Sequence, residues 1–109
     1  MKIVVDTNRI IAALVKKGTT REILFNKNFT FITPEYTLIE INEHKEEIKS
    51  KTKTTEKEFE FLFDIIFEYV KIIPELEYHK FIEDCKNDLT DIDDVPILAT
   101  ALATNADGI

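Results

Sequence analysis

Carboxylate side chains occur at three separate places along the chain where they could bind a cation. Asp6 follows a run of β-branched residues at 3–5, Glu40 lies among apolar residues of a predicted helix, and residues 91–94 carry three aspartates. Carboxylate oxygens are the ligands that Mg²⁺ and Mn²⁺ prefer, and these cations activate water for hydrolysis of phosphodiester bonds. The residue types therefore favour metal-assisted phosphodiester chemistry.

Each of these places also has a simpler interpretation. Asp6 or Thr7 can cap a helix that begins at Asn8, and a helical glutamate such as Glu40 is more often a solvated surface residue. Aspartates before an apolar helix are favoured by capping and by the helix dipole. Three aspartates exceed what one cap needs, however, and like charges held together are unfavourable without a cation. The cluster at 91–94 therefore favours a metal site.

Other kinds of site find little support in the sequence. Two glycines exclude a glycine-rich phosphate loop, and a single cysteine, Cys85, permits neither an intrachain disulfide nor a zinc site built on cysteines. Cys85 lies on an apolar helical face, so we expect it in the core. His44 and His79 stand in charged surroundings without metal-ligand spacing. Carboxylates remain as the candidate ligands.

Alternating strand and helix patterns predict how these carboxylates are positioned. Apolar runs predict strands at residues 3–5, 29–33 and 71–74. Helices are predicted from Asn8 to Val15 with an end at Lys17 and Gly18, from Tyr78 to Lys86, and from Val95 to Leu102. Three further helices are predicted to begin with an N-cap at Thr19 or Thr20, at Pro34, and near Thr55. Residues 49–54 have the composition of an exposed basic linker, and Ile109 that of a first residue of another strand.

This order of elements predicts an α/β fold with a parallel sheet. In such sheets, ligands bind outside the carboxyl ends of the strands. We expect the first strand to be central, which would place Asp6 at the edge of the sheet where a site forms.

Composition limits the class of protein without deciding it. A chain of 109 residues with 44% hydrophobic and 32% charged residues is typical of one globular domain. A net charge of −7 argues against a simple nucleic-acid binder, but bound cations can reverse the sign where a phosphate binds. No signal peptide or membrane-spanning run is apparent, so we expect a cytoplasmic protein.

Three segments resemble the motifs of PIN domains. Residues 4–8 (VVDTN) are similar to the opening motif, residues 33–41 (TPEYTLIEI) to the second motif with Glu40 as its acid, and residues 91–102 (DIDDVPILATAL) to the third. In the third motif Asp94 matches the principal acid and Asp91 a frequent companion. The three segments span nearly the whole chain in the family's order.

The resemblance implies a three-layer α/β/α sandwich and a ribonuclease that depends on Mg²⁺ or Mn²⁺. Asp6, Glu40 and Asp94 would be its catalytic and metal-binding residues, with Asp91 as a further ligand, and RNA products would carry a 5′-phosphate and a 3′-hydroxyl. Many prokaryotic members are VapC-like toxins, restrained by a small antitoxin and usually dimeric. Candidate contacts to the RNA backbone are Arg9, Lys16, Lys45 and the lysines of residues 49–53.

The chain departs from the family pattern at its C-terminal end. PIN domains continue into a strand that closes with a Thr-x-Asp or Asn element, and then into a last strand. We therefore expect one PIN-like domain over residues 1–109 with its last strands missing, one acidic ligand fewer, and an open edge on the first strand. Such an edge favours a homodimer or a higher oligomer.

Two alternatives stay open at this stage. The missing fourth acid is compatible with an inactive PIN-like module that binds metal or RNA. A different Asp-centred α/β protein fits less well: a haloacid dehalogenase phosphatase needs Asp-x-Asp, whereas position 8 is Asn8, and a response-regulator receiver needs paired acids at its first strand, where only Asp6 stands.

Overall fold

The computed structural model describes residues 1–15, 18–88 and 92–109, and a parallel sheet organises them. Its strands are β1 (Lys2–Val4), β2 (Thr30–Pro34) and β3 (Val70–Ile73), in the order β1-β2-β3. Ile3 pairs with Phe31, and Ile32 pairs with Lys71. All pairings are parallel, so the carboxyl ends of the strands lie at one edge. The predicted parallel α/β sheet is confirmed.

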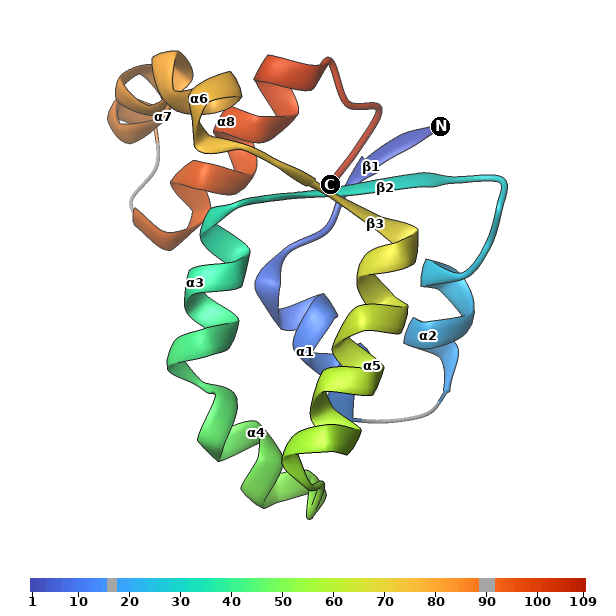
Figure 1. Ribbon diagram of the computed structural model, residues 1–109. Helices are drawn as coiled ribbons and strands as arrows, with labels where there is room; N and C mark the ends of the chain where they lie inside the picture. The colour runs from blue at the N-terminus through green and yellow to red at the C-terminus, as the bar shows by residue number, and fades with distance from the viewer. Residues whose placement is uncertain (16–17, 89–91) are drawn as a thin grey trace.

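Helices cover both faces of this sheet. They are α1 (Thr7–Val15), α2 (Thr19–Leu24), α3 (Tyr36–Glu43), α4 (Lys45–Thr52), α5 (Glu56–Tyr69), α6 (Glu75–Tyr78), α7 (Ile82–Asp88) and α8 (Val95–Thr104), with 3-10 turns η1 (His79–Phe81) and η2 (Ile92–Asp94). In Figure 1, α6 to α8 lie above the sheet and α1 to α5 below it. This is the three-layer arrangement that the resemblance to PIN domains implies.

Two hydrophobic clusters hold the layers together. Successive residues of a strand point to opposite faces. Accordingly, Val5 and Phe31 belong to a cluster with α1 to α5, whereas Val4 and Ile32 belong to a cluster with α6 to α8. Cys85 is buried in the second cluster, as expected. No helix among the described residues has the length and apolar character needed to cross a membrane.

The middle strand is β2, so the prediction that the first strand is central is wrong. The outer side of β1 is also not bare. Val4 N–H donates to the carbonyl of Gly108 at 2.9 Å, and Asp107 N–H donates to the carbonyl of Lys2 at 2.7 Å. These bonds form a parallel bridge between Ile3 and Gly108, with Val4 and Val5 buried. The expected open apolar edge is therefore covered along this stretch.

Residues 49–54 are not the predicted linker, because most of them continue α4. Ile48 is buried and anchors this helix to the core, and the ammonium groups of Lys45 and Lys49 both contact the carboxylate of Glu56 on α5. The chain turns at Lys53, which adopts the left-handed conformation with φ 55°. Contacts between the two helices, rather than local composition, determine the helical conformation of this segment.

The long helix predicted near Thr55 is confirmed, and a capping box begins it. Thr55 Oγ1 accepts from Glu58 N–H at 3.2 Å, and the carboxylate of Glu58 accepts from Thr55 N–H at 3.3 Å. The helix predicted from Tyr78 to Lys86 instead divides into α6, η1 and α7. Tyr78 is buried at the end of α6, and its hydroxyl accepts from Tyr36 N–H at 3.3 Å, which fixes the chain there.

The remaining helix boundaries differ by small amounts from the prediction. Pro34 is the last residue of β2 and not the start of the next helix, which divides at His44 into α3 and α4. Gly18 is the N-cap of α2, in place of Thr19 or Thr20. Its φ of 151° lies where side chains are rarely tolerated, which favours glycine. The predicted helix end at Lys17 lies outside the described residues.

Candidate functional site

Asp6 lies between the carboxyl end of β1 and the start of α1. One of its carboxylate oxygens, Oδ1, accepts a hydrogen bond from Arg9 N–H at 2.9 Å, and its carbonyl accepts from Ile10 N–H at 3.3 Å. Asp6 therefore does cap α1, as the simpler interpretation of this residue predicts. Its other oxygen, Oδ2, has no hydrogen-bond partner among the described residues, so capping leaves it available to a ligand.

The next residue, Thr7, connects this point of the chain to α3. The hydroxyl of Thr7 donates to Oε1 of Glu40 at 2.6 Å. Thr7 is buried and Glu40 is half-buried, so the bond is partly shielded from water. Oε2 of Glu40 has no hydrogen-bond partner in the described part of the chain. The structure thus brings the second predicted acid beside the residue that follows the first.

Two further threonines lie beneath this bond. Thr33, near the end of β2, donates its hydroxyl to the carbonyl of Val5 at 2.8 Å, and its oxygen lies 2.7 Å from the hydroxyl of Thr37 on α3. Thr37 Oγ1 in turn lies 3.5 Å from Thr7 Oγ1. These threonines are not among the site residues predicted from the sequence. The spacing of Thr37 and Glu40, three residues, could have indicated that these two share one side of α3, but Thr33 lies on β2 and carries no such signal.

The third predicted acid, Asp94, stands at the N-terminal end of α8. It is exposed, and its side chain makes no capping hydrogen bond to this helix, so the simpler interpretation as a cap does not hold for Asp94. Val95, which follows it, is buried in the cluster that contains Val4 and Ile32. Helix α8 contacts β1 and β2 directly (Figure 1). Asp91 lies outside the described residues.

The structure relates these acids to one another only in part. Asp6 and Glu40 are linked through Thr7, whereas no described hydrogen bond or ion pair links Asp94 to either. Among the side chains that the structure describes, no group of three or more histidines, cysteines, aspartates or glutamates is arranged to hold a metal ion. The donor chemistry nevertheless suits a hard cation, because Asp6 and Glu40 each retain a carboxylate oxygen outside their hydrogen bonds.

The neighbouring residues Asp6 and Thr7 border two different pockets. Asp6 and Arg9 border a pocket of about 250 Å³ whose other walls are mostly apolar and include Ile109. Thr7 and Glu40 border a pocket of about 510 Å³ that extends between α1 and α4 as far as Lys51. Asp6 and Glu40 therefore border different pockets, one on each side of the Asp6–Thr7 peptide.

Most of the predicted RNA-contacting lysines are already engaged by acids. Lys45 and Lys49 contact Glu56, and Lys51 lies 3.1 Å from a carboxylate oxygen of Glu47. Lys16 lies outside the described residues. Arg9 is exposed, makes no ion pair with a described residue, and follows Asp6 by three positions. Among the predicted cations that the structure describes, Arg9 is the best placed beside the acids.

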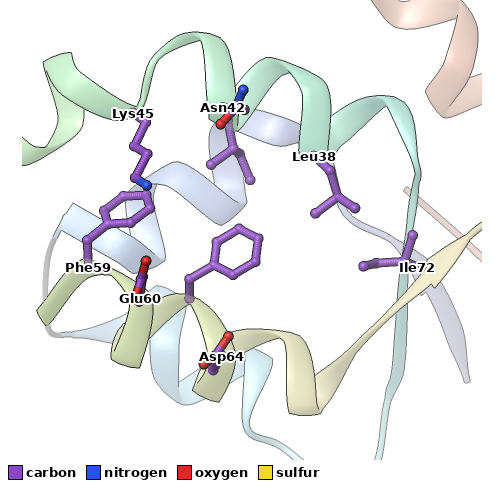
Figure 2. Close-up of a pocket in the computed structure, with 9 residues that line it drawn as sticks. Leu38, Asn42, Lys45, Phe59, Glu60, Asp64 and Ile72 are labelled. Carbon is purple, nitrogen blue, oxygen red and sulfur yellow. The ribbon is translucent and has the colours of Figure 1, made fainter. Parts of the chain in front are cut away.

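A third pocket, of about 380 Å³, lies between α3 and α5 and is shown in Figure 2. Its walls are largely apolar and include Leu38, Phe59 and Ile72, with the polar side chains of Asn42, Lys45, Glu60 and Asp64 around them. Leu38 and Asn42 are one turn apart on α3, and Glu40 lies on the opposite side of that helix. This pocket is therefore separate from the carboxylates of the candidate site.

Comparison with protein families decides the class. A family model described as PIN domain matches residues 4–107, which include Asp6, Glu40 and Asp94. The chain belongs to the PIN domain family. PIN domains are generally nucleases, and those nucleases generally use divalent metals, so the family supports a nuclease-type function. Among curated proteins, no relative matches the sequence.

Proposed function

We propose that this PIN domain protein is an endoribonuclease that depends on Mg²⁺ or Mn²⁺ and acts in the cytoplasm. Asp6, Glu40 and Asp94 hold the cation, and Asp91 is a further ligand. The hydrogen bond from Thr7 to Glu40 carries the proposal, because it joins the residue that directly follows Asp6 to the acid on α3. Both follow strands at the carboxyl edge of the sheet, where ligands bind in parallel α/β folds.

Each side chain has a defined part in this proposal. Thr7 fixes one oxygen of the Glu40 carboxylate and leaves the other for a cation. Oδ1 of Asp6 is fixed by the capping hydrogen bond that it accepts from Arg9 N–H, and this leaves Oδ2 for the cation. Asp94, exposed and not engaged in capping, completes the ligand set from α8. A bound divalent cation supplies an activated water and balances the charge of the scissile phosphate.

Charge also determines how RNA approaches. The net charge of −7 repels a polyanion, and only a cation at the acids makes this edge attractive to phosphate. The guanidinium of Arg9 borders the same pocket as Asp6, so it is our candidate for a contact to the RNA backbone. We therefore expect RNA binding to require the metal.

The test is cleavage of a structured RNA in the presence of Mn²⁺, with EDTA as the metal-free control. Asp6→Asn and Glu40→Gln should each lower the rate by roughly 100-fold or more, the scale for losing a group that stabilises transition-state charge. Glu60→Gln is the matched control, because Glu60 is an exposed acid on α5 outside the candidate site. Products should carry 5′-phosphates. Equal cleavage by the parent and Asp6→Asn would refute the proposal.

The second candidate is an inactive PIN module that binds metal or RNA. It is favoured by one observation, that the described side chains do not form a ready group of three metal ligands. The same assay separates the two candidates. A module binds Mn²⁺ through Asp6 and Glu40 and retains RNA without producing new 5′-phosphate ends, whereas an enzyme produces them.

Partner proteins form a further part of the proposal, based on the resemblance to VapC-like members. We propose that the nuclease is the toxin of a toxin–antitoxin pair and that two or more copies associate. Induced expression in a bacterium should then stop growth, and expression of Asp6→Asn should not. Light scattering of the purified protein measures the number of copies, and a monomer would contradict the proposed association.

A further inference from the structure

Thr33 and Thr37 form a pair of hydroxyl groups that the candidate ligands do not include. Both residues have an exposed fraction of 0%, and their oxygens lie 2.7 Å apart. Thr33 belongs to β2 and Thr37 to α3, so the pair spans the turn that leads from the sheet to the helix of Glu40. Buried hydroxyls without partners are costly, so these contacts constrain both elements.

The direction of each hydrogen bond among the hydroxyls of Thr7, Thr33 and Thr37 follows from counting their hydrogens. A threonine hydroxyl has one hydrogen. The carbonyl of Val5 can only accept, so Thr33 donates to it, and Thr37 must then donate to Thr33. Glu40 accepts the hydrogen of Thr7 at 2.6 Å, so the 3.5 Å separation of Thr7 and Thr37 is a contact rather than a second strong bond. One arrangement of donors satisfies every group.

The hydroxyls of Thr33 and Thr37 contact the residues on both sides of Asp6. Thr33 binds the carbonyl of Val5, the residue before Asp6, and Thr37 contacts Thr7, the residue after it. Thr37 also precedes Glu40 by three residues and lies on the same side of α3. The hydroxyl pair thus connects the position of Asp6 to the position of Glu40.

The start of α3 has no side-chain cap of its own. Glu35 occupies the N-cap position and makes no side-chain capping bond, and α3 has only eight residues. A short helix without a cap is held in place by tertiary contacts. The buried hydroxyls supply polar contacts of fixed direction, whereas apolar packing alone tolerates small rotations of a helix.

We propose that Thr33 and Thr37 are positioning residues for the cation site, setting the Glu40 carboxylate at the distance from Asp6 that one cation requires. The inference rests on the proposed function, because it concerns the same carboxylates. The inference goes beyond the proposed function by assigning a role to two residues that touch neither the cation nor RNA. Partners that orient metal ligands commonly change metal affinity by roughly 10- to 100-fold when removed.

The experiment measures Mn²⁺ affinity by titration calorimetry and the stability of the metal-free protein by urea denaturation. Thr33→Val and Thr37→Val each remove a hydroxyl with little change of volume, and each should weaken Mn²⁺ binding by about 10-fold or more. Thr33→Ser and Thr37→Ser keep the hydroxyl and should bind Mn²⁺ as the parent does. Because the two valine variants are independent, either one tests the positioning role if the other does not fold.

Thr100→Val is the matched control. Thr100 is also 0% exposed, but its hydroxyl has no hydrogen-bond partner among the described residues, and it lies on α8. This variant should keep the Mn²⁺ affinity of the parent. A purely structural role for Thr33 and Thr37 predicts lower stability with unchanged Mn²⁺ affinity of the folded protein, and that result would overturn the inference.

Asp6→Asn separates this inference from the proposed function. If Asp6→Asn binds Mn²⁺ as the parent does, the proposed cation site itself is wrong. If Asp6→Asn loses binding while both valine variants keep it, the cation site stands and the positioning role is wrong. If Thr37→Ser weakens Mn²⁺ binding as much as Thr37→Val does, the hydroxyl is not the cause, which also overturns the inference.

Discussion

The hydroxyl of Thr7 donates a 2.6 Å hydrogen bond to the carboxylate of Glu40, although the two residues are 33 positions apart in the chain. Thr7 directly follows Asp6, so this one bond brings together the first two acidic motifs of the PIN domain. It also commits one oxygen of Glu40 and leaves the other for a ligand. The geometry explains why a small hydroxyl residue is useful after the first acid.

Replacement of Thr7 by valine tests this relationship. Thr7→Val keeps the shape of the side chain but cannot donate to Glu40, so Mn²⁺ affinity and RNA cleavage should both fall by roughly 10- to 100-fold. Thr7→Ser keeps the donor and should retain both. Calorimetry and the cleavage assay provide the measurements. Unchanged Mn²⁺ affinity in the valine variant would show that the hydrogen bond does not organise the site.

The sequence predicts the parts of this fold that local chemistry decides. The β-branched run before Asp6 forms β1, and Thr55 with Glu58 forms the capping box that begins α5. In contrast, residues 49–54 have the composition of a linker and are mostly helical, because Ile48 is buried and Glu56 pairs with lysines across the turn. Such contacts between distant residues are not visible in local composition.

The candidate site was predictable to a similar degree. The motifs single out Asp6 and Glu40, and the structure links them through Thr7. The roles of these acids remain predictions. The hydroxyl pair of Thr33 and Thr37 could not be predicted in the same way, because two threonines in an apolar segment do not reveal that they share a buried hydrogen bond. Only the turn that leads from β2 into α3 brings the two hydroxyls together.

The contact between α4 and α5 should make stability depend on acid pH. Hydrogen bonds from Lys45 and then Lys49 lower the pKa of Glu56 from 4.5 to about 2. Because the folded state has the lower pKa, the stabilisation is fully present above about pH 4.5 and is lost as the pH falls toward about 2. All three groups lie at the surface, so salt should weaken the effect.

Urea denaturation across this pH range tests that contact. Glu56→Gln cannot ionise, so its unfolding free energy should fall less than that of the parent between about pH 5 and pH 2. Glu60→Gln, which changes another exposed acid of α5, should follow the parent. If the Glu56 and Glu60 variants have the same pH dependence, the lysine contacts do not stabilise the hairpin of α4 and α5.

Thr100 should tolerate loss of its hydroxyl. The group is buried on α8 and has no hydrogen-bond partner in the described part of the chain. A buried hydroxyl without a partner costs about 1–3 kcal/mol, so Thr100→Val should leave the unfolding free energy unchanged or raise it by about 1 kcal/mol. Urea denaturation at neutral pH measures the change. A clear loss of stability would mean that Thr100 has a partner beyond the described residues.

The central claim is that Asp6 and Glu40 hold the same cation, and a double-mutant cycle in Mn²⁺ calorimetry tests it most directly. Asp6→Asn and Glu40→Gln preserve side-chain size and remove one charge each. If both carboxylates bind one cation, each single variant should lose most of the affinity, and the double variant should lose little more than either, because neighbouring ligands are not independent. Single variants that bind Mn²⁺ as the parent does, or losses that simply add in the double variant, would contradict the shared site.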